Sequence, residues 1–319
     1  MWAALLLAAC GGGAGSTSAP PPTTPPPATG ATTTTTPAAT TLTAAPAGWS
    51  LPAPSSRQAA VVDGGRIVLA GGLSTGSTTV GDVYRIDPAT GASRRGTPLP
   101  HPVHDVAGTT VGGRPLAFGG GWHTESDDVQ ALDATGTTLL GHLPTPRADL
   151  TAVTVGPTAY VMGGFDGKAA TPDVLTTLDG RSFTTIGQLP VPVRYPAVTV
   201  QGATIYLFGG EAAGGDTDAI QAIDTGTGAM RVAGHLPATL AHASAFTLGG
   251  TVWVVGGRSA GAVSKAMRRF DVGAGTTVDV GTLPAAVRDA AVVVVGDTAY
   301  LLGGATSAPT AAVVRLRAG

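Results

Sequence analysis

The chain has 319 residues, a net charge of −2 at pH 7 and only 12% charged residues. This charge balance excludes the basic field that attracts nucleic acid, so we expect no nucleic-acid partner. Cys10 is the only cysteine, so no disulfide within the chain can hold the fold together.

The first residues have the form of a secretion signal. Residues 2–9 (WAALLLAA) are an apolar run that ends in small residues and is too short to span a bilayer. The sequence Leu7-Ala8-Ala9-Cys10 resembles the bacterial lipoprotein signal, in which the cysteine is lipidated and becomes the mature N-terminus, although no Lys or Arg precedes the run. Residues 1–10 are therefore predicted to be a lipoprotein signal peptide. This places the protein outside the cytoplasm, lipid-anchored at Cys10 to a membrane of the bacterial cell envelope.

A segment rich in Thr, Pro and Ala follows, over residues 11–40. It carries no charge and almost no large apolar side chain, so it cannot bury enough surface to offset the entropy of ordering. We predict a disordered linker that holds the following domain away from the membrane.

A long repeat begins after this linker. Each of six Leu-Pro pairs is followed 20 residues later by a Gly-Gly doublet, and the period varies between 44 and 48 residues. The doublets begin at Gly71, Gly119, Gly163, Gly209, Gly256 and Gly303. Because a period of this length is typical of stacked modular folds, residues 41–319 are predicted to form one repeat domain.

Each repeat predicts four antiparallel strands. In the first repeat, residues 59–62 lead into an Asp-Gly-Gly turn, and residues 67–70 end at the doublet. Residues 83–86 form the third strand, and the last segment covers residues 92–100. The fold class is therefore all-β.

The order of these segments resembles the kelch repeat, in which an apolar or aromatic strand ends in Gly-Gly and the third strand contains tyrosine. Tyr160, Tyr206 and Tyr300 stand just before their doublets, and Tyr84 stands in a third strand. The resemblance implies a six-bladed kelch-type β-propeller. Only one tryptophan, Trp49, stands at the fourth-strand position where the family carries one.

The two ends of the repeat domain predict how the ring closes. The sixth repeat ends after a third strand at residues 311–316, whereas residues 44–50 stand where a fourth strand would precede the first repeat. We predict that this N-terminal strand completes the last blade, which leaves only short and protected sheet edges.

Polar and aromatic residues concentrate in the loops of one predicted face. The segments that lead into the first strands and the loops that follow the doublets meet on that face, where kelch propellers commonly bind ligands around the central funnel. The predicted ligand-binding residues are Arg57, His104, Arg147, Arg194, Tyr195, His242 and Arg288 before first strands, and Trp122, Phe165, Glu211 and Arg258 after doublets. Asp105, Asp149 and Asp289 stand beside them. An arginine before a first strand can instead bond loop carbonyls as part of the kelch motif.

One repeat suggests an enzymatic alternative. Gly209-Gly210-Glu211 is similar to a blade of the periplasmic N-acetylneuraminate epimerases. That resemblance implies a sugar epimerase or mutarotase in which Glu211 is the acid/base and Arg194 or Arg288 grips a carboxylate. The arginine that follows the glutamate in those enzymes is missing, because Gly215-Asp216 stands there.

No metal or cofactor is expected. His104, His123 and His242 lack any local metal-ligand spacing. The copper-radical oxidases with kelch propellers need a cysteine cross-linked to a tyrosine, and Cys10 cannot supply it from the signal segment. The sequence as a whole favours a monomeric, membrane-tethered module that binds a protein or a glycan without catalysis.

Overall fold

The computed structural model of the protein describes residue 15 and residues 38–319. The predicted signal segment 1–10 with Cys10, and residues 11–14 and 16–37 of the predicted linker, lie outside the described residues. Residues 38–319 belong to one unit, Pro37–Gly319. Among the described residues, no helix combines the length and the apolar character that a membrane crossing needs.

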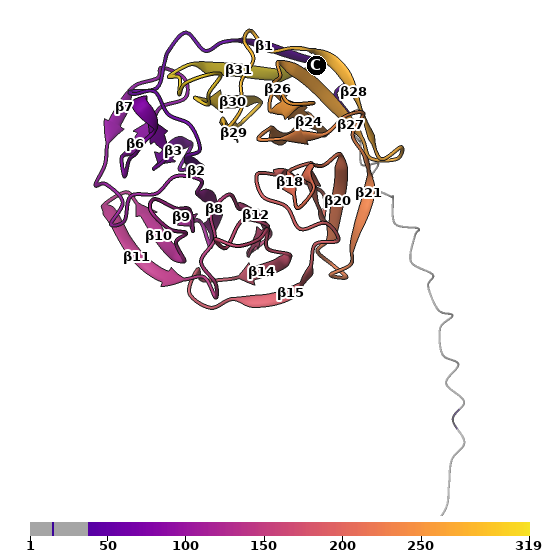
Figure 1. Ribbon diagram of the computed structural model, residues 1–319, viewed down its shortest axis with the longest axis horizontal. Helices are drawn as coiled ribbons and strands as arrows, with labels where there is room; N and C mark the ends of the chain where they lie inside the picture. Colours follow the sequence, from indigo (N-terminus) through magenta and orange to yellow (C-terminus); the bar gives the residue numbers. More distant parts are fainter. Residues whose placement is uncertain (1–14, 16–37) are drawn as a thin grey trace, which may run out of the picture. The chain divides into compact units, whose positions relative to one another are not determined.

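Six four-stranded antiparallel sheets make up this unit and stand as blades around a common axis (Figure 1). Blade 1 consists of β2 (Ala59–Asp63), β3 (Arg66–Ala70), β6 (Val83–Ile86) and β7 (Ser93–Arg95); blade 2 of β8 (Ala107–Val111), β9 (Arg114–Phe118), β10 (Asp128–Asp133) and β11 (Gly136–His142); blade 3 of β12 (Thr151–Val155), β13 (Thr158–Met162), β14 (Asp173–Thr177) and β15 (Thr184–Gln188). Blade 4 consists of β16 (Ala197–Gln201), β17 (Thr204–Phe208), β20 (Ala219–Asp224) and β21 (Met230–His235); blade 5 of β23 (Ser244–Leu248), β24 (Thr251–Val255), β27 (Ala266–Asp271) and β28 (Thr276–Thr282); blade 6 of β29 (Ala291–Val295), β30 (Thr298–Leu302), β31 (Val313–Ala318) and β1 (Leu42–Pro46). The predicted six-bladed all-β propeller is therefore confirmed.

Short strands form in the loops that follow three of the doublets. They are β4 (Leu73–Ser74) and β5 (Thr78–Thr79), joined by the one-turn 3₁₀ helix η1 (Thr75–Ser77); β18 (Glu211–Ala212) and β19 (Gly215–Asp216); and β25 (Arg258–Ser259) and β26 (Ala262–Val263), which pair with β22 (Leu240–Ala241). The bridges Ser56↔Leu73 and Arg194↔Glu211 and the pairing of β22 with β25 join these loops to the segments that lead into first strands.

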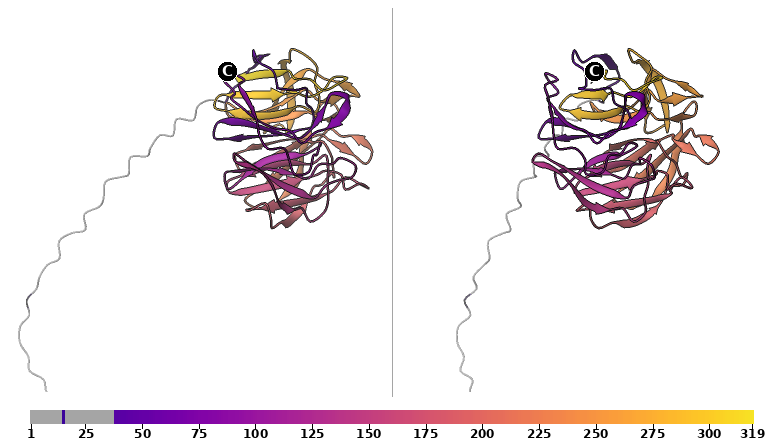
Figure 2. Two further views of the ribbon diagram at one scale, coloured as in Figure 1. Left: turned by 90° about the vertical axis from the view of Figure 1, so that its left-hand side faces the viewer. Right: turned by 60° about the vertical axis from the view of Figure 1, so that its left-hand side comes forward.

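The N-terminal strand closes the ring. β1 pairs with β31 in register from Leu42↔Ala318 to Pro46↔Val314, so the first strand completes the last blade as predicted. Figures 1 and 2 show β1 and the C-terminus side by side. The prediction that Trp49 lies within this strand is wrong, because β1 ends at Pro46. The indole packs against Tyr300 with ring centroids 6.1 Å apart, and its Nε1 donates to the carbonyl of Pro88 at 3.2 Å, so Trp49 joins blade 6 to blade 1.

The hydrophobic core consists of six clusters, one at each contact between neighbouring blades. Between blades 1 and 2 the buried side chains are all aliphatic and include Val68 and Leu132. Between blades 4 and 5, Phe208 and Phe270 meet edge to face at 5.0 Å. Because each blade buries both faces against its neighbours, the apolar runs of the middle strands are nearly continuous.

Each Gly-Gly doublet joins its blade to the next one. The second glycine donates its backbone N–H across the blade boundary, for example Gly164 to the carbonyl of Val193 at 2.9 Å. The first glycine has a φ near +60°, and a Cβ on Gly163 would lie 2.6 Å from that same oxygen. Only glycine combines this conformation with so close an approach of two backbones.

Candidate functional site

A closed ring of backbone hydrogen bonds surrounds the axis where the six first strands begin. Each blade contributes one residue to this axial ring: Arg57, Asp105, Asp149, Tyr195, His242 and Asp289. The N–H of each residue donates to the carbonyl of its counterpart in the preceding blade at 2.8–3.1 Å, and Arg57 closes the circle by donating to Asp289. The main chain alone therefore fixes the position of six polar or aromatic side chains.

All six residues of the axial ring have a left-handed backbone, with φ between +54° and +60°. Non-glycine residues adopt this conformation at a cost of about 1–2 kcal/mol each, and such strain persists where the surrounding structure imposes it. Here the ring of hydrogen bonds imposes it in every blade. Backbone outliers of this kind concentrate at functional sites, which makes the axial ring a candidate site.

A second layer lies directly outside the axial ring. The residue before each ring position bridges to the residue that follows a doublet, as in Arg194↔Glu211, His104↔Gly121 and Arg288↔Ala305. The structure therefore brings the predicted segments before first strands and the loops after doublets together on one face.

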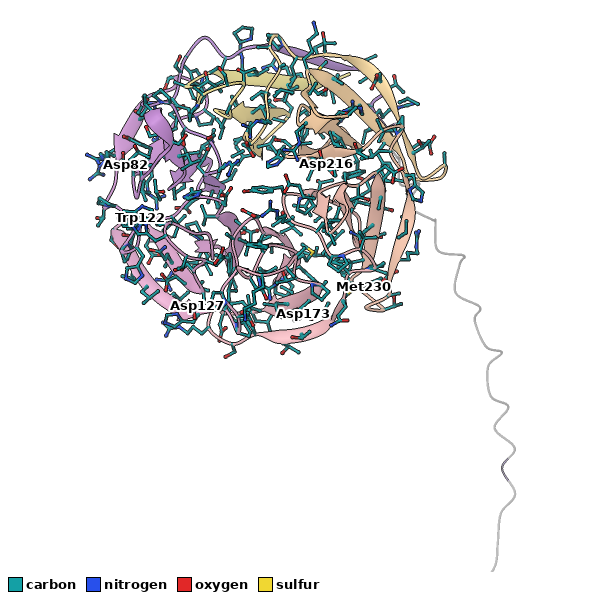
Figure 3. All side chains as sticks on the ribbon, in the orientation of Figure 1. Asp82, Trp122, Asp127, Asp173, Asp216 and Met230 are labelled. Carbon is teal, nitrogen blue, oxygen red and sulfur yellow. The ribbon has the colours of Figure 1, made fainter. Side chains whose placement is uncertain are left out.

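Glu211 is the most heavily bonded carboxylate of this second layer. Its Oε2 accepts from Arg194 at 2.7 Å, and its Oε1 accepts from Nε2 of His242 at 3.0 Å and from Arg258 at 2.6 Å. Burial alone would raise the pKa of Glu211, but the hydrogen bonds from His242, Arg258 and Arg194 lower it to about 2. Arg258 also binds Asp216, which Figure 3 shows closer to the axis than Asp127 and Asp173.

His242 connects the axial ring to this network. Its Nδ1 contacts Oδ1 of Asp289 at 2.5 Å, its Nε2 contacts Glu211, and its ring stacks on Tyr195 with centroids 4.0 Å apart. Burial raises the pKa of Asp289, but the hydrogen bond and charge of His242 outweigh it and leave that pKa lowered. The imidazole therefore joins Asp289 of the axial ring to Glu211 of the second layer.

Arg57 contacts three other residues of the axial ring. Its Nη1 donates to Oδ2 of Asp105 at 3.2 Å and to the hydroxyl of Tyr195 at 3.0 Å, and its Nε lies 3.5 Å from Asp289. Its guanidinium also lies 5.2 Å from the centroid of the Tyr195 ring. Burial and the charge of Asp105 raise the pKa of the Tyr195 hydroxyl, which therefore stays protonated.

Two carboxyls of the axial ring hold protons more tightly than free aspartate does. Burial, followed by the charge of Asp105, raises the pKa of Asp149 to about 7. Burial also raises the pKa of Asp105, although Arg57 opposes it. Oδ1 of Asp105 is buried and has no hydrogen-bond partner among the described residues.

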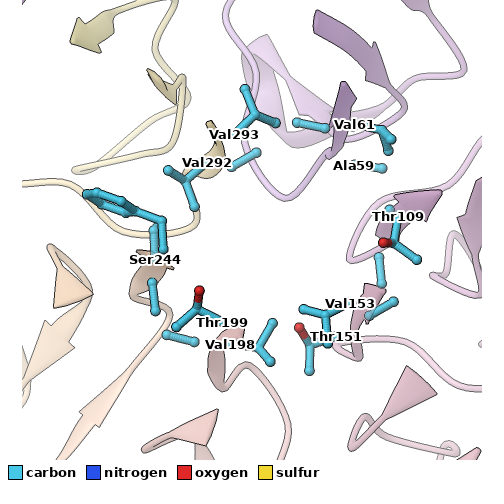
Figure 4. A pocket seen from close by; sticks show the side chains of 18 of the residues that line it. Ala59, Val61, Thr109, Thr151, Val153, Val198, Thr199, Ser244, Val292 and Val293 are labelled. Carbon is cyan, nitrogen blue, oxygen red and sulfur yellow. The ribbon is translucent and has the colours of Figure 1, made fainter. Parts of the chain in front are cut away.

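Three cavities meet at this end of the axis. One of about 110 Å³ is lined by the axial ring, and one of about 200 Å³ lies beside it between Trp122, Phe165 and Arg194. The third, of about 600 Å³, runs along the first strands and is lined mainly by alanine, valine and threonine. Figure 4 shows labelled side chains of this third cavity, such as Val153, Thr199 and Val293, pointing to a common centre. Charged groups therefore concentrate at one end of an otherwise weakly polar channel.

We call the end of the channel that carries the axial ring and the two smaller cavities the mouth. Most of the predicted binding residues line this mouth. The residues that border one of the two smaller cavities or bond to the Glu211 network are Arg57, His104, Trp122, Phe165, Arg194, Tyr195, Glu211, His242 and Arg258, and Arg288 pairs with Asp289 of the axial ring. Trp122 is 55% exposed and stacks on His123 with centroids 4.5 Å apart. Burial, and then the charge of Arg57, lower the pKa of His104.

The prediction that Arg147 binds a ligand is wrong. Its side chain is buried, with 1% of the residue exposed, and its Nη1 donates to the carbonyls of Gly163 and Asp173 at 3.3 Å. It therefore supports the loops from inside and cannot reach a ligand at the mouth. The residues that the predicted set omitted are Asp105, Asp149 and Asp289, and the signal that could have found them is their equivalent place in successive repeats.

The described residues contain one cluster with metal-ligand proximity. Asp127, Asp128 and His142 bring one ligand atom each within 4.8 Å of one another, on β10, β11 and the segment before them. Figure 3 shows Asp127 near the outer edge of the ring, away from the axis. The histidines considered from the sequence, His104, His123 and His242, do not form such a group in residues 38–319.

Comparisons with known proteins support the fold. The family model described as Kelch motif matches residues 54–100, which cover blade 1. A solved structure described as "Structure of YjhT" superposes with a TM-score of 0.72 at 18% sequence identity, over 83% of this chain and 95% of that one. A search of curated proteins gave no match. The chain is therefore a six-bladed β-propeller whose first blade matches the Kelch motif, and its fold is similar to that of the solved structure.

Proposed function

We propose that this protein is an extracytoplasmic binding module, tethered to a membrane at Cys10, whose mouth takes a protein or glycan ligand. The observation that carries the proposal is the axial ring. Its six residues have a strained, left-handed backbone, and their polar or aromatic side chains surround a cavity. Pockets with a few convergent polar groups and perturbed pKa values are the usual places of ligand binding. Exposed Trp122 and the neighbouring Phe165 and Arg194 add the composition of interface hot spots.

A glycan and peptide array probed with the full chain tests this proposal. We expect ligands that bind the wild type and lose affinity when Arg194→Ala opens the Glu211 network. The matched control is Asp297→Asn, which changes an exposed carboxylate in the turn between β29 and β30. Ligands that bind both variants as they bind the wild type would place binding elsewhere on the molecule.

The membrane tether has a separate test. If Cys10 carries a lipid, the wild type partitions with membranes and Cys10→Ala releases the protein into the soluble fraction, since a lipidated cysteine is the anchor. Retention of Cys10→Ala on membranes would contradict the tether and leave the binding proposal intact.

An epimerase or mutarotase is the second candidate, and one observation favours it. Glu211 lies at the mouth with 16% of its side chain exposed, and two arginines, Arg194 and Arg258, lie within reach of it. Its low pKa opposes the idea, because an effective acid/base has a pKa near the working pH. The test is the rate of anomer exchange of N-acetylneuraminic acid, followed by NMR with wild type and Glu211→Gln. Acceleration by the wild type alone would favour the enzyme, and equal rates would exclude it.

A further inference from the structure

The mouth holds a buried hydrogen-bond acceptor that the protein does not satisfy. The side chain of Asp105 is 6% exposed, and its Oδ1 has no partner among the described residues. Its Oδ2 accepts from Arg57 at 3.2 Å and lies 3.3 Å from Nε2 of His104. An unpaired buried carboxylate oxygen costs about 1–3 kcal/mol or more, so it points to a partner that arrives from outside.

The arginines of the mouth are already committed to carboxylates. Arg194, for example, binds Glu211 at 2.7 Å and also lies 3.4 Å from Oδ2 of Asp149. A carboxylate or phosphate ligand would have to break such pairs before it could bind. A ligand that donates hydrogen bonds would find acceptors without breaking any pair. The pairs are Arg57–Asp105, Arg194–Glu211, Arg258–Asp216 and Arg288–Asp289.

Asp105 and Asp149 both line the cavity of about 110 Å³. This volume accepts the end of an alkylamine chain and no large group. Burial, and then the charge of Asp105, raise the pKa of Asp149 to about 7, so the negative charges of the two carboxylates add at this place.

We infer that the floor of the mouth binds a primary ammonium group between the carboxylates of Asp105 and Asp149. The inference rests on the proposed binding function and specifies its ligand chemistry. An ammonium supplies three donors and one positive charge, whereas a hydroxyl supplies one donor and no charge. The two carboxylates are not part of a cluster with metal-ligand proximity, which argues against a metal ion in this position.

The direct experiment titrates the full chain with n-butylammonium chloride at constant ionic strength, and 1-butanol serves as the matched uncharged probe. We expect saturable binding of butylammonium, no comparable binding of butanol, and at least about a tenfold loss of affinity in Asp105→Asn and in Asp149→Asn, since one charged hydrogen bond is worth that much. Asp297→Asn should bind as the wild type does. Asparagine keeps the shape of each site, and if Asp105→Asn fails to fold, Asp149→Asn alone decides.

Proton release provides a second readout. The carboxyl of Asp149 is surrounded by Asp105, Arg57, Arg194 and Tyr195, and near pH 7 it is about half protonated. An ammonium between the two carboxylates displaces that proton, so the wild type should release protons into weakly buffered solution on binding, and Asp149→Asn should not.

Several outcomes would overturn the ammonium site. They are the absence of saturable butylammonium binding, equal binding of butanol, and unchanged affinity in Asp105→Asn and Asp149→Asn. Array ligands whose affinity for the mouth survives acetylation of all their amines would also overturn it while leaving the proposed binding function standing. An array without any ligand would contradict the binding function itself, and the butylammonium titration would remain a separate result.

Discussion

The Gly-Gly doublets can be tested with two alanine substitutions that share the same backbone strain. Gly163, the first glycine of the third doublet, has φ +62°, and Gly202, in the turn between β16 and β17, has φ +60°. A Cβ on Gly163 would lie 2.6 Å from the carbonyl oxygen of Val193, whereas a Cβ on Gly202 meets nothing within 4 Å. The two variants therefore differ in the clash and share the left-handed conformation.

The magnitude follows from the geometry. Both variants lose about 1 kcal/mol because alanine is strained at this φ. In Gly163→Ala the carbonyl of Val193 must also move by roughly 0.8 Å to reach ordinary contact distance, which breaks the 2.9 Å hydrogen bond from Gly164. The lost bond and the strain of overpacking cost about 3 kcal/mol more.

The assay is thermal unfolding followed by circular dichroism. Gly202→Ala should lower Tm by about 2–4 °C, and Gly163→Ala should lower it by at least about 6 °C more. Equal losses in the two variants would refute the argument that the doublet is fixed by the approach of Val193, and would leave backbone conformation as the only reason for glycine.

Three further predictions concern closure, pH and the buried arginine. Deleting residues 41–50 removes β1 and Trp49 and should lower Tm markedly. Deleting residues 16–36, which lie outside the described residues, is the control and should leave Tm unchanged. An unchanged Tm in the first deletion contradicts closure by β1. Because the folded state raises the pKa of Asp149 from 3.8 to about 7, its contribution to stability is lost as pH rises between about 4 and 7, with a slope of up to about 1.4 kcal/mol per pH unit in urea unfolding. Asp149→Asn should reduce that slope, leaving the part that comes from Asp105, and an unchanged slope in the variant disproves the assignment. Arg147→Met should lower the unfolding free energy by about 2–3 kcal/mol while mouth ligands bind as before, and a selective loss of affinity would return Arg147 to the binding site.

The sequence predicted the scaffold well because the scaffold depends on residues with few alternatives. Glycine doublets and Asp-Gly-Gly turns fix strand ends, so the third strand at residues 83–86 was predicted at its observed bounds. The position of Trp49 was wrong because an aromatic residue that joins two blades and one that sits within a strand look alike in a short segment. Pairing of Leu42 with Ala318 depends on a register that only the folded ring defines.

The site was predicted less completely, because a difference of one residue in position before the axial ring changes where a side chain points. Arg147 stands two residues before the axial ring position Asp149, and Arg194 stands one residue before Tyr195. That single step turns one guanidinium into the interior and the other towards the mouth. The left-handed conformation of the axial ring left only a weak trace in the sequence, since four of its six residues are aspartate or histidine, which are enriched in this conformation but common elsewhere.

The hydrogen bonds of the axial ring do not depend on the side chains of its residues. Its hydrogen bonds join main-chain atoms only, and the doublets join blades in the same way, so neither constrains which side chain stands at the ring positions. Arginine, aspartate, tyrosine and histidine occupy equivalent places with φ values within a few degrees of one another. The backbone therefore accepts different side chains at these positions, and under the proposed binding function the charges of these side chains would select the ligand. In this chain the selection favours a donor, because each guanidinium of the mouth faces a carboxylate and Oδ1 of Asp105 has no partner among the described residues.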